Sequence, residues 1–238
     1  MVLLEVEGVQ KRFGGVHAVR GVDLTVEKGA LLGLFGPNGA GKTTLFNLIA
    51  GAASPDAGRV RLNGVDITRY PAVRRARLGI ARTFQVVRPF RSLTVLDNVL
   101  ASVPSAAAAH HNTVDDAMTI LASVGLDRRA GDLAGQLTLG MLKRLEVARA
   151  LALEPCLLLL DEPLAGLTTG EAADLLSLIQ KLKARTSIVM VDHNVRQSLA
   201  LCDRAVVLDA GAVIAVGTPD QVRRDPEVIR AYLGEAAV

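Results

Sequence analysis

The sequence is poor in cysteine and in aromatic residues. Its 238 residues include two cysteines, two tyrosines, five phenylalanines and no tryptophan. Two cysteines exclude a disulfide framework, and a chain of this length can bury a sizeable core without one. Because Cys156 and Cys202 sit among apolar residues, we expect both to be buried thiols in a reducing compartment.

Long hydrophobic runs and a strong charge imbalance are also missing. The longest apolar runs, 30–35 and 156–160, have the length of a strand and fall far short of a membrane span. No charged-then-apolar segment opens the chain, so no signal peptide is expected. With 27 Lys and Arg against 24 Asp and Glu, the net charge is +3. This excess is too small to predict nucleic acid as a partner.

Strand-like and helix-like segments alternate along most of the chain. Short apolar or alternating runs predict strands, and longer periodic segments between them predict helices. The expected strands are 2–9, 18–26, 31–35, 59–62, 80–84, 157–160, 187–191, 205–208 and 213–216, and the expected helices are 41–51, 170–183 and 193–202. This order is typical of an α/β fold with a parallel sheet covered on both sides.

One stretch departs from the alternation. Residues 94–153 contain helical signals at 114–124 and 139–153 and few strand signals. We expect one domain over residues 1–238, in which a helical subdomain of about 94–153 is inserted into an α/β core of about 1–93 and 154–238.

A phosphate-binding loop follows the apolar run 31–35. The segment reads Gly36, Pro37, Asn38, Gly39, Ala40, Gly41, Lys42, Thr43 and Thr44. It matches G-x-x-x-x-G-K-T between a strand and a helix, which is the context that such a loop requires. Its backbone amides and the helix amino terminus would cradle phosphates. Lys42 would reach the β- and γ-phosphates, and the Thr43 hydroxyl would ligate Mg²⁺.

An acidic pair follows a second apolar strand. Four consecutive leucines at 157–160 lead directly into Asp161 and Glu162. Ligands of open α/β sheets lie at the carboxyl ends of the strands, so this pair should face the phosphates. Asp161 would hold Mg²⁺ through water, and Glu162 would polarise the attacking water.

Three further motifs turn a general phosphate-loop ATPase into a specific one. Gln85 ends an expected strand, residues 137–141 read Leu-Thr-Leu-Gly-Met just upstream of the acidic strand, and His193 follows the strand at 187–191. With the phosphate loop and the acidic pair, this order resembles the ATP-binding domain of ATP-binding-cassette (ABC) proteins. The resemblance implies a P-loop NTPase with a RecA-like core, an antiparallel β subdomain and the inserted helical subdomain.

The resemblance also assigns roles to residues. It implies that Phe13 stacks on adenine, with a core phenylalanine as the alternative, and that Gln85 helps to coordinate Mg²⁺ and senses the transporter. His193 would contact the γ-phosphate region and orient Glu162. Two cassettes pack head to tail in this family, so Thr138 and Gly140 would contact the ATP bound to the other chain.

Finer matches are similar to one subfamily. The segments 11–15, 79–85, 144–149 and 228–236 resemble the ATPase subunits of branched-chain amino acid importers. ATPases of importers for urea, short amides or other amino acids are similar, so these solutes remain alternatives. The implied partners are membrane permease subunits, a second ATPase subunit and an external solute-binding protein. The implied location is the cytoplasmic face of the bacterial inner membrane.

Two motifs depart from the usual pattern of the subfamily. Met141 and Leu142 stand where polar residues are usual, and Thr168 and Thr169 replace a loop that usually contains Asn-Pro or Asp. Residues 137–141 form the signature of this chain, and these changes concern the ATP site that the signature would complete on a second chain. They leave its own phosphate loop and acidic pair intact.

Residues 69–91 carry seven arginines and no acidic residue. This pattern is typical of a solvated face. A nucleic-acid patch is a second interpretation, although few aromatic residues are interleaved with the arginines. By the family resemblance, the apolar residues at 86–90 would instead receive a helix of the membrane subunit, with arginines near the lipid headgroups.

Two rival functions belong to other classes. A soluble ABC ATPase of DNA repair would carry a long coiled coil between the phosphate loop and the signature, and a translation factor would carry two cassettes. A regulator that binds nucleotide without turnover would not need Glu162 and His193.

Overall fold

The larger sheet of the protein has six strands. A computed structural model describes residues 1–103, 113–192 and 195–233. The strand order is β10 (Ala212–Gly217), β9 (Arg204–Asp209), β3 (Leu31–Phe35), β8 (Ser187–Val191), β7 (Leu157–Asp161) and β6 (Ile80–Arg82). The central strands β3, β7 and β8 are buried along their whole length, as strands covered on both faces should be. β10 runs antiparallel to β9, so the parallel part of the sheet that the sequence predicted ends at β9.

The smaller sheet is antiparallel. Its order is β2 (Val16–Glu27), β1 (Val2–Phe13), β4 (Ala57–Leu62) and β5 (Val65–Asp66). Asn63 and Gly64, with φ of 50° and 77°, form the tight turn between β4 and β5 that the sequence predicted. Helix α1 (Lys42–Ala50) packs in one buried apolar cluster with residues of both sheets.

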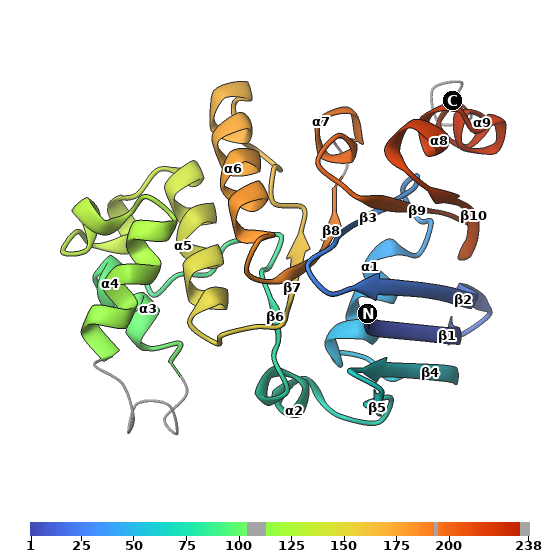
Figure 1. The fold of residues 1–238 in the computed structure, drawn as a ribbon, viewed down its shortest axis with the longest axis horizontal. Helices are drawn as coiled ribbons and strands as arrows, with labels where there is room; N and C mark the ends of the chain where they lie inside the picture. Colours follow the sequence, from blue (N-terminus) through green and yellow to red (C-terminus); the bar gives the residue numbers. More distant parts are fainter. Residues whose placement is uncertain (104–112, 193–194, 234–238) are drawn as a thin grey trace.

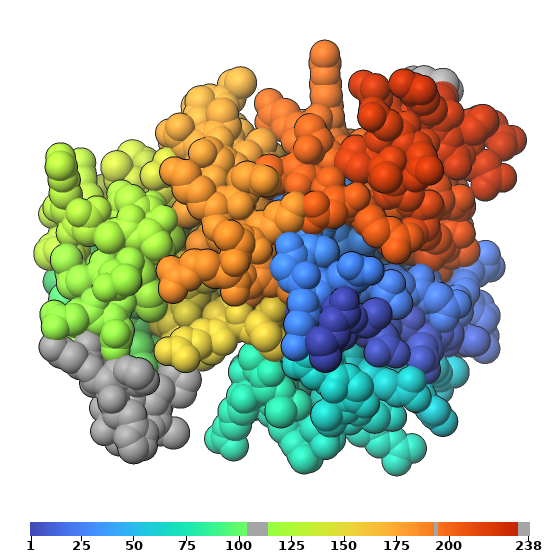
Figure 2. All heavy atoms as spheres, in the orientation of Figure 1, coloured from blue at the N-terminus to red at the C-terminus, as the bar shows by residue number. Residues whose placement is uncertain are grey.

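Helices alone occupy the described part of residues 95–151. They are α3 (Val95–Leu100), α4 (Thr113–Ser123), the short 3₁₀ helices η1 (Asp127–Arg129) and η2 (Ala134–Gln136), and α5 (Leu139–Leu151). Figure 1 shows α3, α4 and α5 grouped on the side of the molecule away from β1, β2 and β4. The same block forms one end of the surface in Figure 2.

The remaining helices lie around the larger sheet, and all but the first of them pack on one of its faces. They are α2 (Ala72–Arg77), α6 (Thr169–Leu182), α7 (Val195–Leu199), α8 (Pro219–Arg224) and α9 (Pro226–Leu233). Thr168 caps α6 in a capping box with Glu171, so the unusual Thr168-Thr169 pair starts a helix well. Within the described ranges, no helix has both the length and the apolar character needed to cross a bilayer.

Two expectations about burial need correction. Cys202 is buried, but Cys156 is only half-buried, and its thiol donates to the carbonyl oxygens of Leu78 and Gly79, just before β6. The solvated-face interpretation of residues 69–91 is wrong for Arg75, which is 1% exposed. Its guanidinium donates to backbone carbonyls of Leu48, Ile49, Thr68 and Tyr70. Burial lowers the pKa of Arg75 to about 10.

Candidate functional site

The phosphate loop joins β3 to α1 and lines a cavity of about 590 Å³. Gly36, Gly39 and Gly41 have φ of 140°, 76° and 95°, a region that glycine enters without strain. A Cβ on Gly41 would lie 2.2 Å from the Ala18 carbonyl oxygen, so only glycine fits there. The amides at the start of α1 and the dipole of the helix make this cavity a site for an anion.

Lys42 is the buried cation of this cavity. Its side chain is 5% exposed, and Nζ donates to the carbonyl oxygens of Gly36, at 2.6 Å, and Pro37, at 2.7 Å. Asn38, Gly39, Ala40, Gly41, Thr43 and Thr44 line the same cavity. The structure therefore brings the predicted phosphate-binding residues together.

The acidic pair lies at the carboxyl end of β7, as predicted. Asp161 is the last residue of the strand, and Glu162 follows it with a φ of 45°. A non-glycine residue seldom adopts this backbone conformation, and it turns the Glu162 side chain out of the strand direction. Glu162 is 7% exposed and lines the cavity of the phosphate loop. A carboxylate therefore shares one cavity with Lys42 and the loop amides.

Gln85 reaches the site from a loop. The prediction that it ends a strand is wrong, because β6 stops at Arg82. Beyond Arg82, the Asp161 N–H of β7 donates to the Thr83 hydroxyl at 3.3 Å. A side-chain oxygen thus takes the place of the backbone carbonyl that would continue the pairing of β6 with β7. The Gln85 amide Nε2 donates to Glu162 Oε2 at 2.6 Å. Gln85 and Glu162 are thus in direct contact.

Arg82 is a site residue that the sequence analysis missed. Its guanidinium donates to Asp161 Oδ2 and to Asn47 Oδ1, each at 2.6 Å, and lies 5.0 Å from the centroid of the Phe46 ring. Arg82 therefore holds the Asp161 carboxylate in place and ties β7 to α1. The pattern of seven arginines gave no signal that this one faces the site.

One face of α5 holds the segment after β6. Lys143 Nζ donates to the carbonyl oxygens of Gln85, at 2.9 Å, and Glu162, at 3.1 Å. About one turn further along, Glu146 accepts from the Arg88 N–H at 3.3 Å, and after about one more turn Arg149 donates to the Arg88 carbonyl at 2.9 Å. Burial lowers the pKa of Lys143. These three charged residues are spaced three apart on a predicted helix, which places them on one face. This spacing was the sequence signal that could have identified them.

Phe13, Thr138 and Gly140 do not line this cavity. Phe13 is 55% exposed at the end of β1, which excludes the alternative of a core phenylalanine. Thr138 caps α5, and its hydroxyl accepts from the Met141 N–H at 3.4 Å. Gly140 packs against the Glu171 carboxylate. Val16 and His17, rather than Phe13, line the cavity beside the loop. His193 lies outside the described residues.

The oxygen donors of the site fit Mg²⁺. Asp161 is 5% exposed and pairs with Val191 of β8, and Thr43 lines the cavity. No cluster of three or more His, Cys, Asp or Glu side chains that could hold a metal occurs among the residues the structure describes. Mg²⁺ commonly binds through one or two protein oxygens plus phosphate oxygens and water, so a small donor set is suitable.

Comparisons with known proteins agree with this geometry. The sequence profile of the ABC transporter family matches residues 19–165. The chain belongs to the ABC transporter family. A second profile, described as branched-chain amino acid ATP-binding cassette transporter, matches residues 212–238 of this ABC protein.

Curated relatives of this ABC protein match it over nearly its full length. The high-affinity branched-chain amino acid transport ATP-binding proteins BraF of Pseudomonas aeruginosa and LivG of Escherichia coli K12 are each 39% identical to it, over 98% of both chains. Family and relatives together identify the chain as an ATP-binding, ATP-hydrolysing subunit of a transporter.

Solved structures confirm the predicted fold class. The ADP conformation of MJ1267, an ATP-binding cassette of an ABC transporter, has a TM-score of 0.90 and 33% identity over 98% of this chain and 99% of that one. A dimeric, post-hydrolysis cassette, MJ0796 bound to ADP and Pi, has a TM-score of 0.79 and 25% identity over 91% of this chain and 99% of that one.

Proposed function

We propose that this chain hydrolyses MgATP to drive a bacterial importer of branched-chain amino acids. The names of BraF and LivG and the profile matched at residues 212–238 support this solute class. The observation that carries the chemistry is the position of Glu162, whose carboxylate lines the same cavity as Lys42 and the phosphate-loop amides.

The reaction needs phosphate binding and an activated water. We assign phosphate binding to the loop 36–44, in which Lys42 would exchange its contacts with the Gly36 and Pro37 carbonyls for the β- and γ-phosphates. Glu162 would orient and polarise the attacking water, with the Gln85 amide holding its carboxylate at 2.6 Å.

Mg²⁺ would supply charge neutralisation between the phosphates. Its proposed protein contacts are the Thr43 hydroxyl, Asp161 through water, and Gln85. Arg82 already holds one oxygen of the Asp161 carboxylate at 2.6 Å, which leaves the other oxygen to face a bound water. A contact through water agrees with the small number of protein ligands that Mg²⁺ uses beside phosphate.

Phe13 and His193 complete the proposed site within one chain. Phe13 would stack on adenine, because an exposed ring at the end of β1 offers its face to a flat base. His193 would contact the γ-phosphate region and orient Glu162.

The signature would act on a second copy or a second cassette. Thr138 and Gly140 lie at the start of α5, in the helical block, and do not line the cavity of their own phosphate loop. Helix amides placed at the γ-phosphate of another chain would bind its negative charge. The dimer of MJ0796 supports such a pairing.

Coupling to membrane permease subunits would use the segment after β6. Phe84, Val86 and Phe90 are 53%, 67% and 49% exposed, an apolar surface beside Gln85. An importer would also need an external solute-binding protein, and the chain would lie on the cytoplasmic face of the inner membrane. The division into a core of about 1–93 and 154–238 and a helical subdomain of about 94–153 is part of this proposal.

Replacement of Glu162 by glutamine tests the catalytic assignment. Glu162→Gln keeps the size of the side chain and its hydrogen bonding but removes the base, so we expect ATP binding close to wild type and hydrolysis about 10²- to 10⁴-fold slower. Single-turnover hydrolysis of labelled ATP, together with a binding titration, measures both quantities.

The control is Glu154→Gln, which changes an exposed carboxylate outside the cavity. It should hydrolyse ATP at the wild-type rate. Full turnover by Glu162→Gln would place the base elsewhere, and loss of binding in that variant would show a structural role for the carboxylate.

A further inference from the structure

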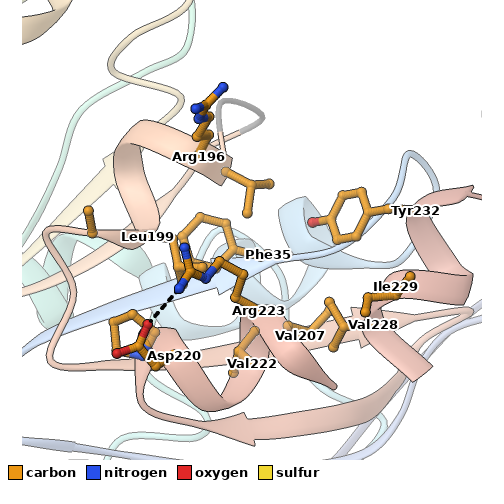
Figure 3. Close-up of a pocket in the computed structure, with 13 residues that line it drawn as sticks. Phe35, Arg196, Leu199, Val207, Asp220, Val222, Arg223, Val228, Ile229 and Tyr232 are labelled. Atoms are coloured by element: carbon orange, nitrogen blue, oxygen red, sulfur yellow. Dashed lines mark hydrogen bonds and ion pairs between the residues drawn. The ribbon is translucent and has the colours of Figure 1, made fainter. Parts of the chain in front are cut away.

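Tyr232 of helix α9 reaches the first residue of the phosphate loop. The Gly36 N–H donates to the Tyr232 hydroxyl at 2.7 Å between N and O, although the two residues are 196 positions apart in the sequence. Figure 3 shows the hydroxyl end of Tyr232 turned inward, on the side of Phe35, the residue that precedes Gly36. The contact therefore joins the end of the described chain to the nucleotide cavity.

Gly36 connects this contact to Lys42. Its carbonyl oxygen accepts from Lys42 Nζ at 2.6 Å, on the other side of the same Cα. Gly36 has a φ of 140°, and a Cβ there would meet the Leu208 carbonyl oxygen at 2.0 Å, so the position must be glycine. Glycine has the greatest backbone freedom of any residue. Because Gly36 has no Cβ to limit its backbone, the hydrogen bond to its N–H is a restraint that comes from outside the loop.

A cavity lies beside this hydrogen bond. The cavity has a volume of about 560 Å³ and is bounded by the sheet and by α7, α8 and α9 (Figure 3). Its lining includes Phe35, Val207, Leu199, Val222, Val228 and Tyr232. Val222 and Val228 are nevertheless buried, 2% and 6% exposed, so α8 and α9 still pack on the core. The hydrogen bond of the Tyr232 hydroxyl adds a polar tie between α9 and the phosphate loop.

We propose that Tyr232 is a positioning residue for nucleotide binding. Its hydroxyl accepts from the Gly36 N–H and so fixes the backbone conformation at the start of the phosphate loop. In the absence of ATP it thereby also positions the Gly36 carbonyl, which accepts from Lys42. A displacement of α9 then alters the loop. This inference rests on the proposed role of the loop in ATP binding, and the experiment separates the two.

Removal of the hydroxyl alone tests the inference. Tyr232→Phe in the full chain keeps the ring and leaves the buried Gly36 N–H without this acceptor. We expect the Kd for ATP in the presence of Mg²⁺ to rise about threefold to tenfold, the range of one hydrogen bond, with kcat at saturating ATP near wild type. Without nucleotide, hydrogen exchange of a peptide that contains Gly36 should be faster.

Two matched variants control for general effects. Tyr70→Phe removes the hydroxyl of the other tyrosine in the chain. The guanidinium carbon of Arg74 lies 3.6 Å from the centroid of the Tyr70 ring. Ile229→Ala shortens a side chain of α9 that is 44% exposed and leaves the Tyr232 hydroxyl intact. Both variants should bind ATP with wild-type affinity and show wild-type exchange at Gly36.

Three results would overturn the inference. Wild-type affinity and exchange in Tyr232→Phe, with or without a lower melting temperature, would reduce Tyr232 to a structural tether of α9. Equal weakening by Tyr232→Phe and Ile229→Ala would assign the effect to looser packing of the helix. Failure of the wild-type chain to bind ATP would contradict the proposed function, and this inference with it.

Discussion

Single residues of the site were predictable where a motif fixes both type and spacing. The loop 36–44 and the pair Asp161 and Glu162 come together as expected, because a strand–loop–helix context determines where their backbone goes. Arg82 and Tyr232 were not predictable. Their partners, Asp161 and Gly36, are 79 and 196 positions away, and only the assembled sheet brings them near.

The exposed ring of Phe13 leads to a prediction about adenine binding. Phe13→Ala should weaken ATP binding by about 1–3 kcal/mol, the range of stacking between a base and an aromatic side chain, and Phe13→Tyr should be nearly neutral. Because the ring is 55% exposed, neither change should lower the melting temperature of the nucleotide-free protein appreciably. Equal damage by both substitutions in a titration with ATP would remove Phe13 from the adenine site.

At the scale of elements, the ends of strands and the polar faces of helices were the hardest to predict. The expected strand at 80–84 runs two residues past Arg82, the last residue of β6. Thr83 and Phe84 favour a strand, but only one further backbone bond follows, from the Thr83 N–H to the Leu159 carbonyl. Helix α5 was predicted, although its end was placed two residues too late. The contacts that its polar side chains make were not predicted. Its charged residues Lys143, Glu146 and Arg149 face the segment after β6, where an amphipathic pattern would have suggested solvent.

The contacts of Lys143 give a prediction for α5. Lys143→Met keeps an unbranched side chain but removes two bonds that hold the backbones of Gln85 and Glu162. Each bond contributes about 1 kcal/mol, so we expect kcat to fall by up to about thirtyfold while the affinity for ATP changes little. Steady-state ATPase assays with a nucleotide titration separate kcat from binding.

Lys181→Met, on the exposed face of α6, is the matched control and should keep wild-type kinetics. A Lys143→Met protein with unchanged kcat would show that α5 does not support the catalytic carboxylate. A protein that lost ATP binding as well would show that the whole cavity depends on this lysine.

At the scale of the whole molecule, each chain holds the proposed parts of two different ATP sites. The phosphate loop lies between the two sheets, and the signature lies at the start of α5 in the helical block (Figure 1). The family resemblance anticipated this division, because it concerns the order of elements along the chain. It could not foresee the packing of Met141, whose side chain lies partly buried against the apolar core.

The atypical signature predicts weak activity for the chain alone. In a homodimer both sites would face Leu-Thr-Leu-Gly-Met, in which Met141 cannot donate a side-chain hydrogen bond. One such contact is worth roughly 1 kcal/mol, so Met141→Gln should raise the ATPase rate several-fold, and pairing with a cassette that has a polar signature should do the same. The rate is measured for each protein alone and with the partner.

The same measurements in the Glu162→Gln background show how much hydrolysis this chain's own site contributes. A fast wild-type homodimer that Met141→Gln leaves unchanged would mean that the departure at residue 141 has no consequence for turnover.

The order of the larger sheet also constrains how the protein is made. β3, completed at Phe35, has β8 and β9 as its two neighbours, and these strands begin at Ser187 and Arg204. A ribosome must therefore add about 150 residues, by this count, before the central strand gains either neighbour, during which its apolar residues have no sheet to join. Such long-range pairing is slow and leaves strand edges exposed to aggregation. Expression at low temperature, or with chaperones that shield apolar segments, should therefore raise the yield of folded protein.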